Sequence, residues 1–481
     1  MNVRATVAEI VAAPADEAVK ERVAALVARA REAQRAFEVA GQSTLDTAAA
    51  AAAWAIMEPD RNRQLAERAV QDTGLGNIGD KIGKNYRKTL GLLRDLHGQR
   101  TCGVISRDPE RGIVEIARAV GVVAAITPST NPAATPANKI INALKCGNAV
   151  IVAPSPKGYS SCALLIGFIH QQFERAGIDP ALVQMLPEPV SKLASAELMR
   201  AADLVVATGS QANVRMAYTS GTPAFGVGAG NVASIVERSA DLAEAARKIA
   251  RSKTFDNATS CSSENSIVID DAVYDAMLEQ LRRCKGVLLD AGQKARLQAA
   301  MWRDGKLSER CTAKSAQQIA QLAGLDELAA REPKFLMVEE DGFGPEHPFS
   351  GEKLSPVLAV YRASDFADAA RIVQHIYAYM GAGHSVGLHT ANADFAVELG
   401  ERLPVARVIV NQAHCLATGG NFDNGLPFSL SMGCGTWGRN NFSGNLDFHY
   451  YLNVTRVAYP IEERMPDPDT LLGDYFARVG R

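Results

Sequence analysis

The sequence predicts an α/β protein made of two doubly wound lobes with a small β extension. Its 481 residues exceed the length of one ordinary domain, so two large lobes are expected. From residue 119 onward, short apolar runs alternate with helical segments, which is typical of parallel sheets covered by helices. An alternating stretch with a central turn signal at residues 101–118 predicts the extension.

Composition limits the class of protein. The formal net charge is −2, and no basic stripe or Arg-rich tail indicates a nucleic-acid partner. The eight cysteines form no C-x-x-C pair and no Cys/His spacing, so we expect no metal and no disulfide framework. Free cysteines fit a reducing cytoplasm, and the first residues lack the apolar core of a signal peptide. The alanine-rich run at 48–57 is too short for a bilayer, which needs about 20 residues, so we expect a buried helix and no membrane partner.

The first part of the chain, residues 1–97, is expected to be helical. Alanine, glutamate and arginine dominate it, and apolar residues recur at spacings of three and four from Val19 to Ala30. Residues 74–79 match G-x-G-x-x-G, but no strand precedes them, so the match does not indicate a dinucleotide site. A β-hairpin is expected next, because Asp-Pro-Glu-Arg-Gly at 108–112 is a turn signal between alternating residues.

The alternating pattern after residue 119 places the ligand site. In a doubly wound sheet, ligands bind at the carboxyl ends of the strands. Three predicted strands end in loops rich in Pro, Ser, Thr or Gly, at residues 127–132, 154–157 and 208–210. A second α/β unit is expected over residues 266–430, with strand-like runs at 335–338, 357–361 and 408–410.

Cys261 is the candidate nucleophile. It lies in a polar loop between two strand-like runs and is flanked by Thr259, Ser260, Ser262 and Ser263. Small polar neighbours with free backbone N–H groups are expected to lower the pKa of a thiol and to stabilise an oxyanion. Free cysteine is more often a small buried hydrophobe, and the other seven fit that description.

Motifs along the chain resemble the CoA-acylating branch of the aldehyde dehydrogenase superfamily. Thr-Phe-Asp-Asn at 254–257 stands four residues before Cys261, and a Ser-Glu pair follows it, as in that branch. Lys81 and Lys84 also match, although a solvated helix face would give the same pattern. The resemblance runs from about residue 72 to 459, and it implies an aldehyde dehydrogenase-like fold.

The resemblance also implies roles for particular residues. Cys261 would be the nucleophile, and the Asn131 amide, which otherwise reads as an ordinary Asn-Pro turn, would donate to the oxyanion together with the Cys261 N–H. NADP or NAD would be the cofactor and CoA the co-substrate. The implied cofactor contacts are Thr127, Pro128, Ser155, Lys157, Gly209, Ser210, Gly228 and Glu352. His384 is a further candidate for contact with CoA or substrate.

Two departures from the hydrolytic branch bear on the reaction, one on the acyl acceptor and one on the cofactor. Val227 stands where that branch has a glutamate that activates water. Because valine cannot accept a proton and water needs a base more than a thiol does, CoA is favoured over water as the acyl acceptor. No glutamate follows the strand near residue 153 to bind the adenosine ribose, and Lys157 suits a 2′-phosphate, so NADP is expected to be accepted.

The expected substrate is sulfoacetaldehyde, which the overall resemblance also suggests. Predicted substrate contacts are Thr259, Ser260, Ser262, His414 and Arg439, with the Arg439 guanidinium as the cation for the sulfonate. The alternatives are an acylating acetaldehyde or propanal dehydrogenase, a hydrolytic aldehyde dehydrogenase, and a catalytically silent structural member of the fold.

The resemblance implies a division of the chain into three parts. Residues 1–100 and 119–230 would form the nucleotide-binding domain, and residues 231–445 the catalytic domain that carries Cys261. The hairpin at 101–118 and the tail at 446–481, with a strand over 447–459, would join subunits of a homo-dimer or homo-tetramer.

Overall fold

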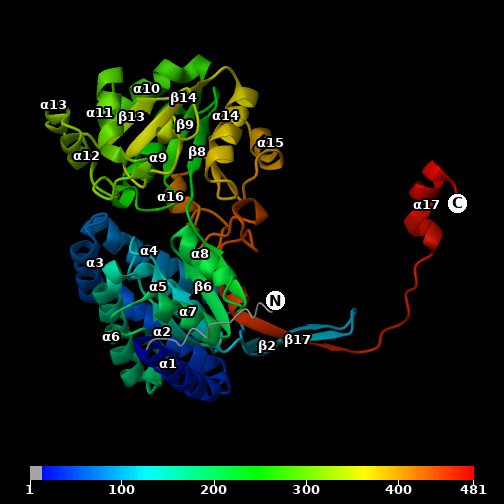
Figure 1. Cartoon of the computed structure of the whole chain (residues 1–481). Coiled ribbons are helices and arrows are strands. Elements are labelled where there is room, and N and C mark those ends of the chain that lie inside the picture. The colour runs from blue at the N-terminus through cyan, green and yellow to red at the C-terminus, as the bar shows by residue number, and fades with distance from the viewer. Residues whose placement is uncertain (1–13) are drawn as a thin grey trace, which may run out of the picture.

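A computed structural model describes residues 14–481. Two lobes lie one above the other, each built on a parallel sheet with helices on its faces (Figure 1). The predicted α/β class is therefore confirmed. Residues 1–13, which begin the predicted helical region, lie outside the described part of the chain.

The first lobe contains a five-stranded parallel sheet in the order β5-β4-β3-β6-β7. Its strands are short, apolar and almost fully buried, as expected for a parallel sheet covered on both faces. The bounds are Val122–Ile126 (β3), Ala149–Ala153 (β4), Val183–Met185 (β5), Leu204–Thr208 (β6) and Ala224–Val227 (β7).

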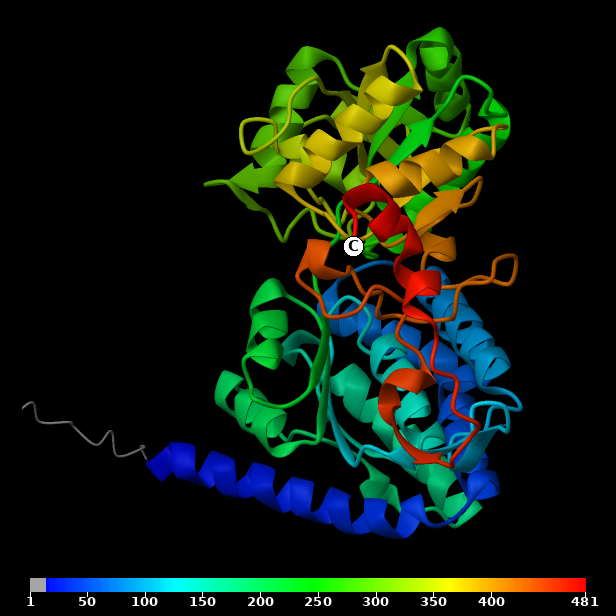
Figure 2. The same cartoon turned by 90° about the vertical axis from the view of Figure 1, so that its right-hand side faces the viewer.

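Eight helices accompany this sheet, and four of them precede it in the chain. The long first helix runs across the outer side of the lobe (Figure 2). The predicted buried alanine helix is α2, in which Ala48, Ala52 and Ile56 are fully buried. The bounds are Pro14–Glu38 (α1), Gln42–Met57 (α2), Pro59–Thr73 (α3), Ile78–Leu96 (α4), Ala134–Lys145 (α5), Tyr159–Ala176 (α6), Lys192–Ala201 (α7) and Gln211–Tyr218 (α8).

The second lobe contains a seven-stranded parallel sheet in the order β10-β13-β14-β9-β8-β15-β16. The buried residues of its strands belong to two separate apolar clusters. Val268 belongs to one cluster, and its neighbour Ile267 belongs to the other. The strand bounds are Val232–Val236 (β8), Glu264–Asp270 (β9), Gly286–Leu288 (β10), Phe335–Glu339 (β13), Val357–Ala363 (β14), Val386–His389 (β15) and Val408–Val410 (β16). The helix bounds are Leu242–Thr254 (α9), Tyr274–Arg283 (α10), Ala291–Met301 (α11), Ala316–Leu322 (α12), Asp326–Ala329 (α13), Phe366–Tyr379 (α14), Asp394–Arg402 (α15) and His414–Ala417 (α16).

A three-stranded antiparallel sheet extends from the first lobe. The hairpin of β1 (Gly103–Asp108) and β2 (Ile113–Ala119) lies where the turn signal predicts it, and β2 also pairs with β17 (Leu452–Ala458). The strand expected over 447–459 begins only at Leu452, because residues Phe448–Tyr451 form a 3-10 helix capped by Asp447. The last helix, α17 (Pro468–Val479), stands away from both lobes (Figure 1). Among the described residues, no helix combines the length and apolar character needed to cross a bilayer.

Candidate active site

A cavity of about 440 Å³ opens at the carboxyl ends of β3, β6 and β7. The loops that follow these strands line it, and so does the loop that carries Cys261. All of the predicted cofactor contacts except one reach this cavity: Thr127, Pro128, Ser155, Gly209, Ser210, Gly228 and Glu352. The position agrees with the general rule that ligands of α/β sheets bind beyond the carboxyl ends of the strands.

The lining of this cavity fits a dinucleotide. Ser210 caps α8 by accepting from the Asn213 N–H, so the positive end of that helix faces the cavity, which favours phosphate. The Thr127 hydroxyl is buried and finds no hydrogen-bond partner among residues 14–481. Gly228 lets the Gln211 side chain pack closely against the backbone at the cavity wall, because a Cβ there would lie 2.6 Å from Gln211 Nε2.

Lys157 is the predicted cofactor residue that does not line the cavity. Its Nζ lies 2.6 Å from Glu309 Oε2, and both side chains are more than half exposed. An exposed ion pair of this kind contributes little stability and exchanges partners readily.

Cys261 lies in a turn between a 3-10 segment, Phe255–Ala258, and β9. Its thiol is half-buried, and burial raises its pKa to about 12, with the nearby Glu352 as a second cause. The sequence predicts a lowered pKa from the polar neighbours. That prediction was wrong for the ligand-free fold, because loss of hydration outweighs the backbone N–H contribution.

His384 is the side chain that the fold brings to the thiol. Its Nε2 lies 3.5 Å from Cys261 Sγ, and its Nδ1 lies 2.7 Å from the Ser385 hydroxyl. Burial lowers the pKa of His384 to about 3, so the imidazole is neutral near pH 7. The sequence singles out His384 only by resemblance, since 123 residues separate it from Cys261.

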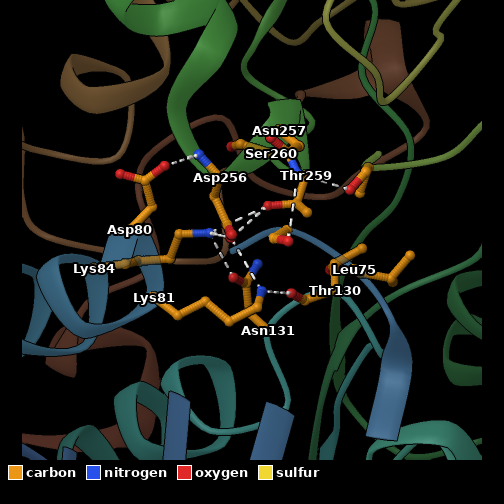
Figure 3. A network of polar contacts seen from close by, with 12 residues as sticks. Leu75, Asp80, Lys81, Lys84, Thr130, Asn131, Asp256, Asn257, Thr259 and Ser260 are labelled. Carbon is orange, nitrogen blue, oxygen red and sulfur yellow. Dashed lines mark hydrogen bonds and ion pairs between the residues drawn. The ribbon is translucent and has the colours of Figure 1, made fainter. Parts of the chain in front are cut away.

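Asn131 belongs to a buried network of polar contacts (Figure 3). Lys84 Nζ donates to Asn131 Oδ1 at 2.7 Å and to Asp256 Oδ2 at 2.6 Å. Because the Oδ1 atom accepts from a cation, and the Nδ2 amide group of Asn131 has no acceptor among residues 14–481, that group can donate elsewhere. Lys81 Nζ also reaches Asp256 Oδ2, at 3.1 Å, and donates to the carbonyl of Thr130 beside Asn131.

The side chains of this network are removed from solvent, contrary to the reading of α4 as a solvated face. The Lys81, Lys84 and Asp256 side chains are 4%, 6% and 0% exposed. The two ammonium groups favour the carboxylate, so the pKa of Asp256 is lowered even though burial opposes this. The network therefore fixes both the Asn131 loop and the start of the Cys261 loop to α4.

The backbone around Asp256 is bent to reach these partners. Asp256, Asn257 and Ala258 all have positive φ, of 51°, 51° and 58°. Asp256 N donates to Asp80 Oδ2 at 2.7 Å, which secures the bend. Gly76, in the G-x-G-x-x-G match, packs against Asp256, and a Cβ there would lie 1.9 Å from Asp256 Oδ1. That glycine thus serves close packing against the Cys261 loop.

A second cavity, of about 50 Å³, adjoins the first. Both cavities are lined by Asn131, Ser260, Leu430 and Met432, so they meet beside the loop that carries Cys261. Ser262 lines the smaller one, whereas Thr259 lines the larger one and donates from Oγ1 to Asp256 Oδ2 at 2.8 Å. The smaller cavity is also lined by Lys84, Arg87 and Lys88.

Two predicted substrate contacts line neither cavity. Arg439 is exposed and ends a 3-10 turn with φ 58°. His414 is buried, and its Nδ1 lies 2.8 Å from the Ser262 carbonyl oxygen, so it supports the Cys261 loop from behind. Burial lowers the pKa of His414 to about 4. The sequence could not exclude these positions, because glycine-rich loops carry no periodicity that orients a side chain.

Glu340, Asp341 and His347 form a cluster with metal-ligand geometry elsewhere in the second lobe. Glu340 already lies 3.2 Å from Lys294 Nζ and 2.8 Å from His347 Nδ1, so these partners account for its carboxylate.

Comparison with known proteins agrees with this geometry. The model of the aldehyde dehydrogenase family matches residues 1–301. An acylating sulfoacetaldehyde dehydrogenase from Cupriavidus necator is 72% identical, over 97% of this chain and 94% of that protein. Another, from Bilophila wadsworthia, is 40% identical over 94% and 98%. The crystal structure of an acetylating aldehyde dehydrogenase from Geobacillus thermoglucosidasius is 33% identical, with a TM-score of 0.90 over 94% of this chain and 99% of that one. The resemblance found in the sequence is confirmed: the chain belongs to the aldehyde dehydrogenase family.

Proposed function

We propose that the protein is a CoA-acylating aldehyde dehydrogenase that converts sulfoacetaldehyde to sulfoacetyl-CoA. One juxtaposition carries the proposal: Cys261 and Asn131 line a dinucleotide-sized cavity that adjoins a small cationic one, and His384 lies 3.5 Å from the Cys261 sulfur. The similarity to acylating sulfoacetaldehyde dehydrogenases supports the choice of substrate.

The thiolate of Cys261 attacks the aldehyde carbon, and the carbonyl oxygen becomes an oxyanion. The Asn131 amide and the Cys261 N–H donate to it, which lowers the barrier. The carbon–oxygen double bond re-forms as the carbon loses its hydride, which a nicotinamide held in the larger cavity would accept, and the acyl group remains on Cys261 as a thioester. The CoA thiol then attacks this thioester, so the acyl–sulfur bond to Cys261 breaks and acyl-CoA leaves.

His384 is proposed to receive the thiol proton. Its neutral imidazole stands 3.5 Å from Cys261 Sγ, and burial keeps it unprotonated with a pKa of about 3. Because burial raises the pKa of the thiol to about 12, the resting site holds a neutral thiol. Attack therefore requires removal of this proton, and an imidazole with a pKa of about 3 can accept it only once substrate binding has brought the two pKa values closer together.

The acyl acceptor is CoA and not water. Val227, at the position of the water-activating glutamate of the hydrolytic branch, is a buried apolar residue at the end of β7. Among the residues lining the larger cavity, Glu352 is the one carboxylate, and its Oε1 accepts from the Gly230 N–H at 3.1 Å. A thiol needs less activation than water, since thiols ionise near pH 8.5 and water far above.

Either NAD or NADP serves as the cofactor, with NADP accepted through Lys157. The Lys157–Glu309 pair is exposed, so Lys157 can leave it to meet a 2′-phosphate at little cost. A catalytic efficiency with NAD far above that with NADP would exclude this role.

The test is nicotinamide reduction by the purified protein with sulfoacetaldehyde, with and without CoA, using NAD and NADP in parallel. Strict dependence on CoA is expected, together with loss of activity in Cys261→Ser. Turnover without CoA would identify a hydrolytic enzyme. A preference for acetaldehyde or propanal over sulfoacetaldehyde would retain the mechanism and reject the substrate.

The β extension is proposed to join subunits of a homo-dimer or homo-tetramer. Most of β17 is exposed, and exposed apolar residues continue beyond it at Tyr459 and Ile461. An exposed edge of this kind is a template for pairing with another chain. Light scattering should give a mass of two or four chains, and a monomer at micromolar concentration would contradict the proposal.

A further inference from the structure

The small cavity beside Asn131 and Ser260 carries an unusual balance of charge. Lys84, Arg87 and Lys88 contribute to its lining, and no acidic residue of the described chain does. The three cations stand at positions i, i+3 and i+4 of α4, which places them on one face of that helix. The rest of the lining is serine, asparagine, backbone and apolar side chains, including Phe255 and Phe428.

The charge of Lys84 is balanced by a carboxylate, whereas the charges of Arg87 and Lys88 are not. Asp256 pairs with Lys84 at 2.6 Å, whereas neither Arg87 nor Lys88 has a carboxylate within 4.0 Å in residues 14–481. Lys88 Nζ donates to the carbonyls of Gly419 and Gly420, at 2.9 and 2.8 Å. Arg87 Nη2 donates to Asn421 Oδ1 at 2.7 Å.

The surroundings of Lys88 make its charge costly without an anion. Burial lowers its pKa to about 7, and the positive charges of Arg87 and Lys84 act in the same direction. The Cys415 thiol, which faces it from α16, acts in the opposite direction, and its own pKa is raised to about 12 by burial. An anion in the cavity would restore the favourable partner that the fold does not supply.

The second side of the cavity is held against these cations by close packing. Gly91 of α4 lets the ring of Phe428 approach, since a Cβ there would lie 2.3 Å from the ring atoms. Lys88 and Arg94 lie over the Phe428 ring at 5.3 and 4.8 Å. The loop around residues 419–428 therefore lies against the half-buried Lys88, whereas Arg87 lines the cavity from an exposed position.

We infer that Arg87 and Lys88 bind the anionic end of the aldehyde, which is a sulfonate in the proposed substrate. The aldehyde carbonyl would then lie at Asn131 and Ser260, where the small cavity meets the one that contains Cys261. This inference rests on the proposed function and replaces Arg439, which the sequence suggested for the same task, by two cations that line the cavity.

The test compares sulfoacetaldehyde with the neutral aldehyde propanal in Lys88→Met and Arg87→Met. Loss of a charge-assisted hydrogen bond should lower kcat/KM for sulfoacetaldehyde by about 10- to 100-fold, mainly through KM. The efficiency with propanal should stay within about twofold, since neither cation touches the carbonyl. An equal loss with both aldehydes would assign Lys88 a purely structural role and overturn the inference.

Two further variants separate the alternatives. Arg94→Met is the matched control, because Arg94 lies on the same helix and over the same Phe428 ring but lines neither cavity. It should leave the ratio of the two efficiencies unchanged. Arg439→Met tests the competing position, and a selective loss with sulfoacetaldehyde in this variant alone would restore Arg439.

Failure of the proposed substrate gives a different result from failure of the anion site. If the wild type does not prefer sulfoacetaldehyde, titration calorimetry with ethanesulfonate still tests the site directly. Binding to the wild type that is lost in Lys88→Met would support an anion site with another substrate. Equal binding to both proteins, or no binding to the wild type, would overturn it.

Discussion

Replacing Asp256 with asparagine removes the carboxylate that both Lys81 and Lys84 contact. The change is nearly isosteric, and asparagine tolerates the positive φ of 51° at this position, so the backbone bend should persist. Breaking a buried ion pair costs about 3–5 kcal/mol, because the remaining charge is left unpaired in a poorly hydrated place. All three side chains are at most 6% exposed, so solvent does little to screen the loss.

The loss of stability should depend on pH in a defined direction. Burial already lowers the pKa of Lys81 to about 8, and removal of Asp256 takes away a contribution that raises it. In the variant, Lys81 can lose its proton, which removes the unpaired buried charge. This recovers about 1.4 kcal/mol of stability for each unit by which the pH exceeds the pKa of Lys81 in the variant. The difference in unfolding free energy between wild type and variant should therefore shrink as pH rises toward 8. Above pH 8 Lys81 is mostly neutral in both proteins, so the difference should level off there.

The assay is urea unfolding at several pH values between 6 and 9, followed by both tryptophan fluorescence and circular dichroism. Asp270→Asn is the matched control, since that carboxylate is 3% exposed but pairs with Arg238, which is 52% exposed and stays hydrated. The control should lose less than about 1 kcal/mol. A loss below about 1 kcal/mol in Asp256→Asn, or a loss that does not change with pH, would refute the reasoning.

Two other predictions concern the nucleophile loop. Burial raises the pKa of the Cys261 thiol to about 12, so its alkylation by iodoacetamide should be slow at pH 7, and the rate should keep rising beyond pH 9. Peptide mass spectrometry measures this rate, and a plateau below pH 8 would contradict the prediction. Gly230→Ala should lower kcat by about 100-fold, because the new Cβ would lie 2.6 Å from the Cys261 carbonyl oxygen and 2.9 Å from His384 Cδ2. Gly83→Ala, where a Cβ meets nothing within 4 Å, is its control and should keep full activity.

Local sequence patterns were enough to predict most of the secondary structure and the family. The strands of both parallel sheets are short apolar runs. A strand that is buried on both faces needs apolar residues along its whole length, so it can be found without knowing which strands lie next to it. The turn at residues 109–112 and the alanine-rich α2 were predictable for the same reason, since each depends on residues close together in the chain. The start of β17 was not, because the Asp447 cap and the 3-10 helix before it override the alternating pattern.

The site depended on contacts between distant segments. The Lys84–Asp256 pair joins residues 172 apart, and the helix pattern of α4 could not show whether its lysines face water or another segment. The same holds for Arg87 and Lys88, which become cavity-lining cations only because the loop around residues 419–428 folds over α4.

The sequence by itself determined the alternating α/β architecture, the polar loop that carries Cys261 and the strand-end loops that line the larger cavity, because these follow from periodicity and from motifs read in order. Only the tertiary structure decided the electrostatics. It placed His384 beside Cys261, raised the pKa of the thiol, exposed Arg439 and left Arg87 and Lys88 without a carboxylate within 4.0 Å among residues 14–481. The physical reason is that hydration and Coulomb interactions depend on distances across the fold, which no local pattern contains.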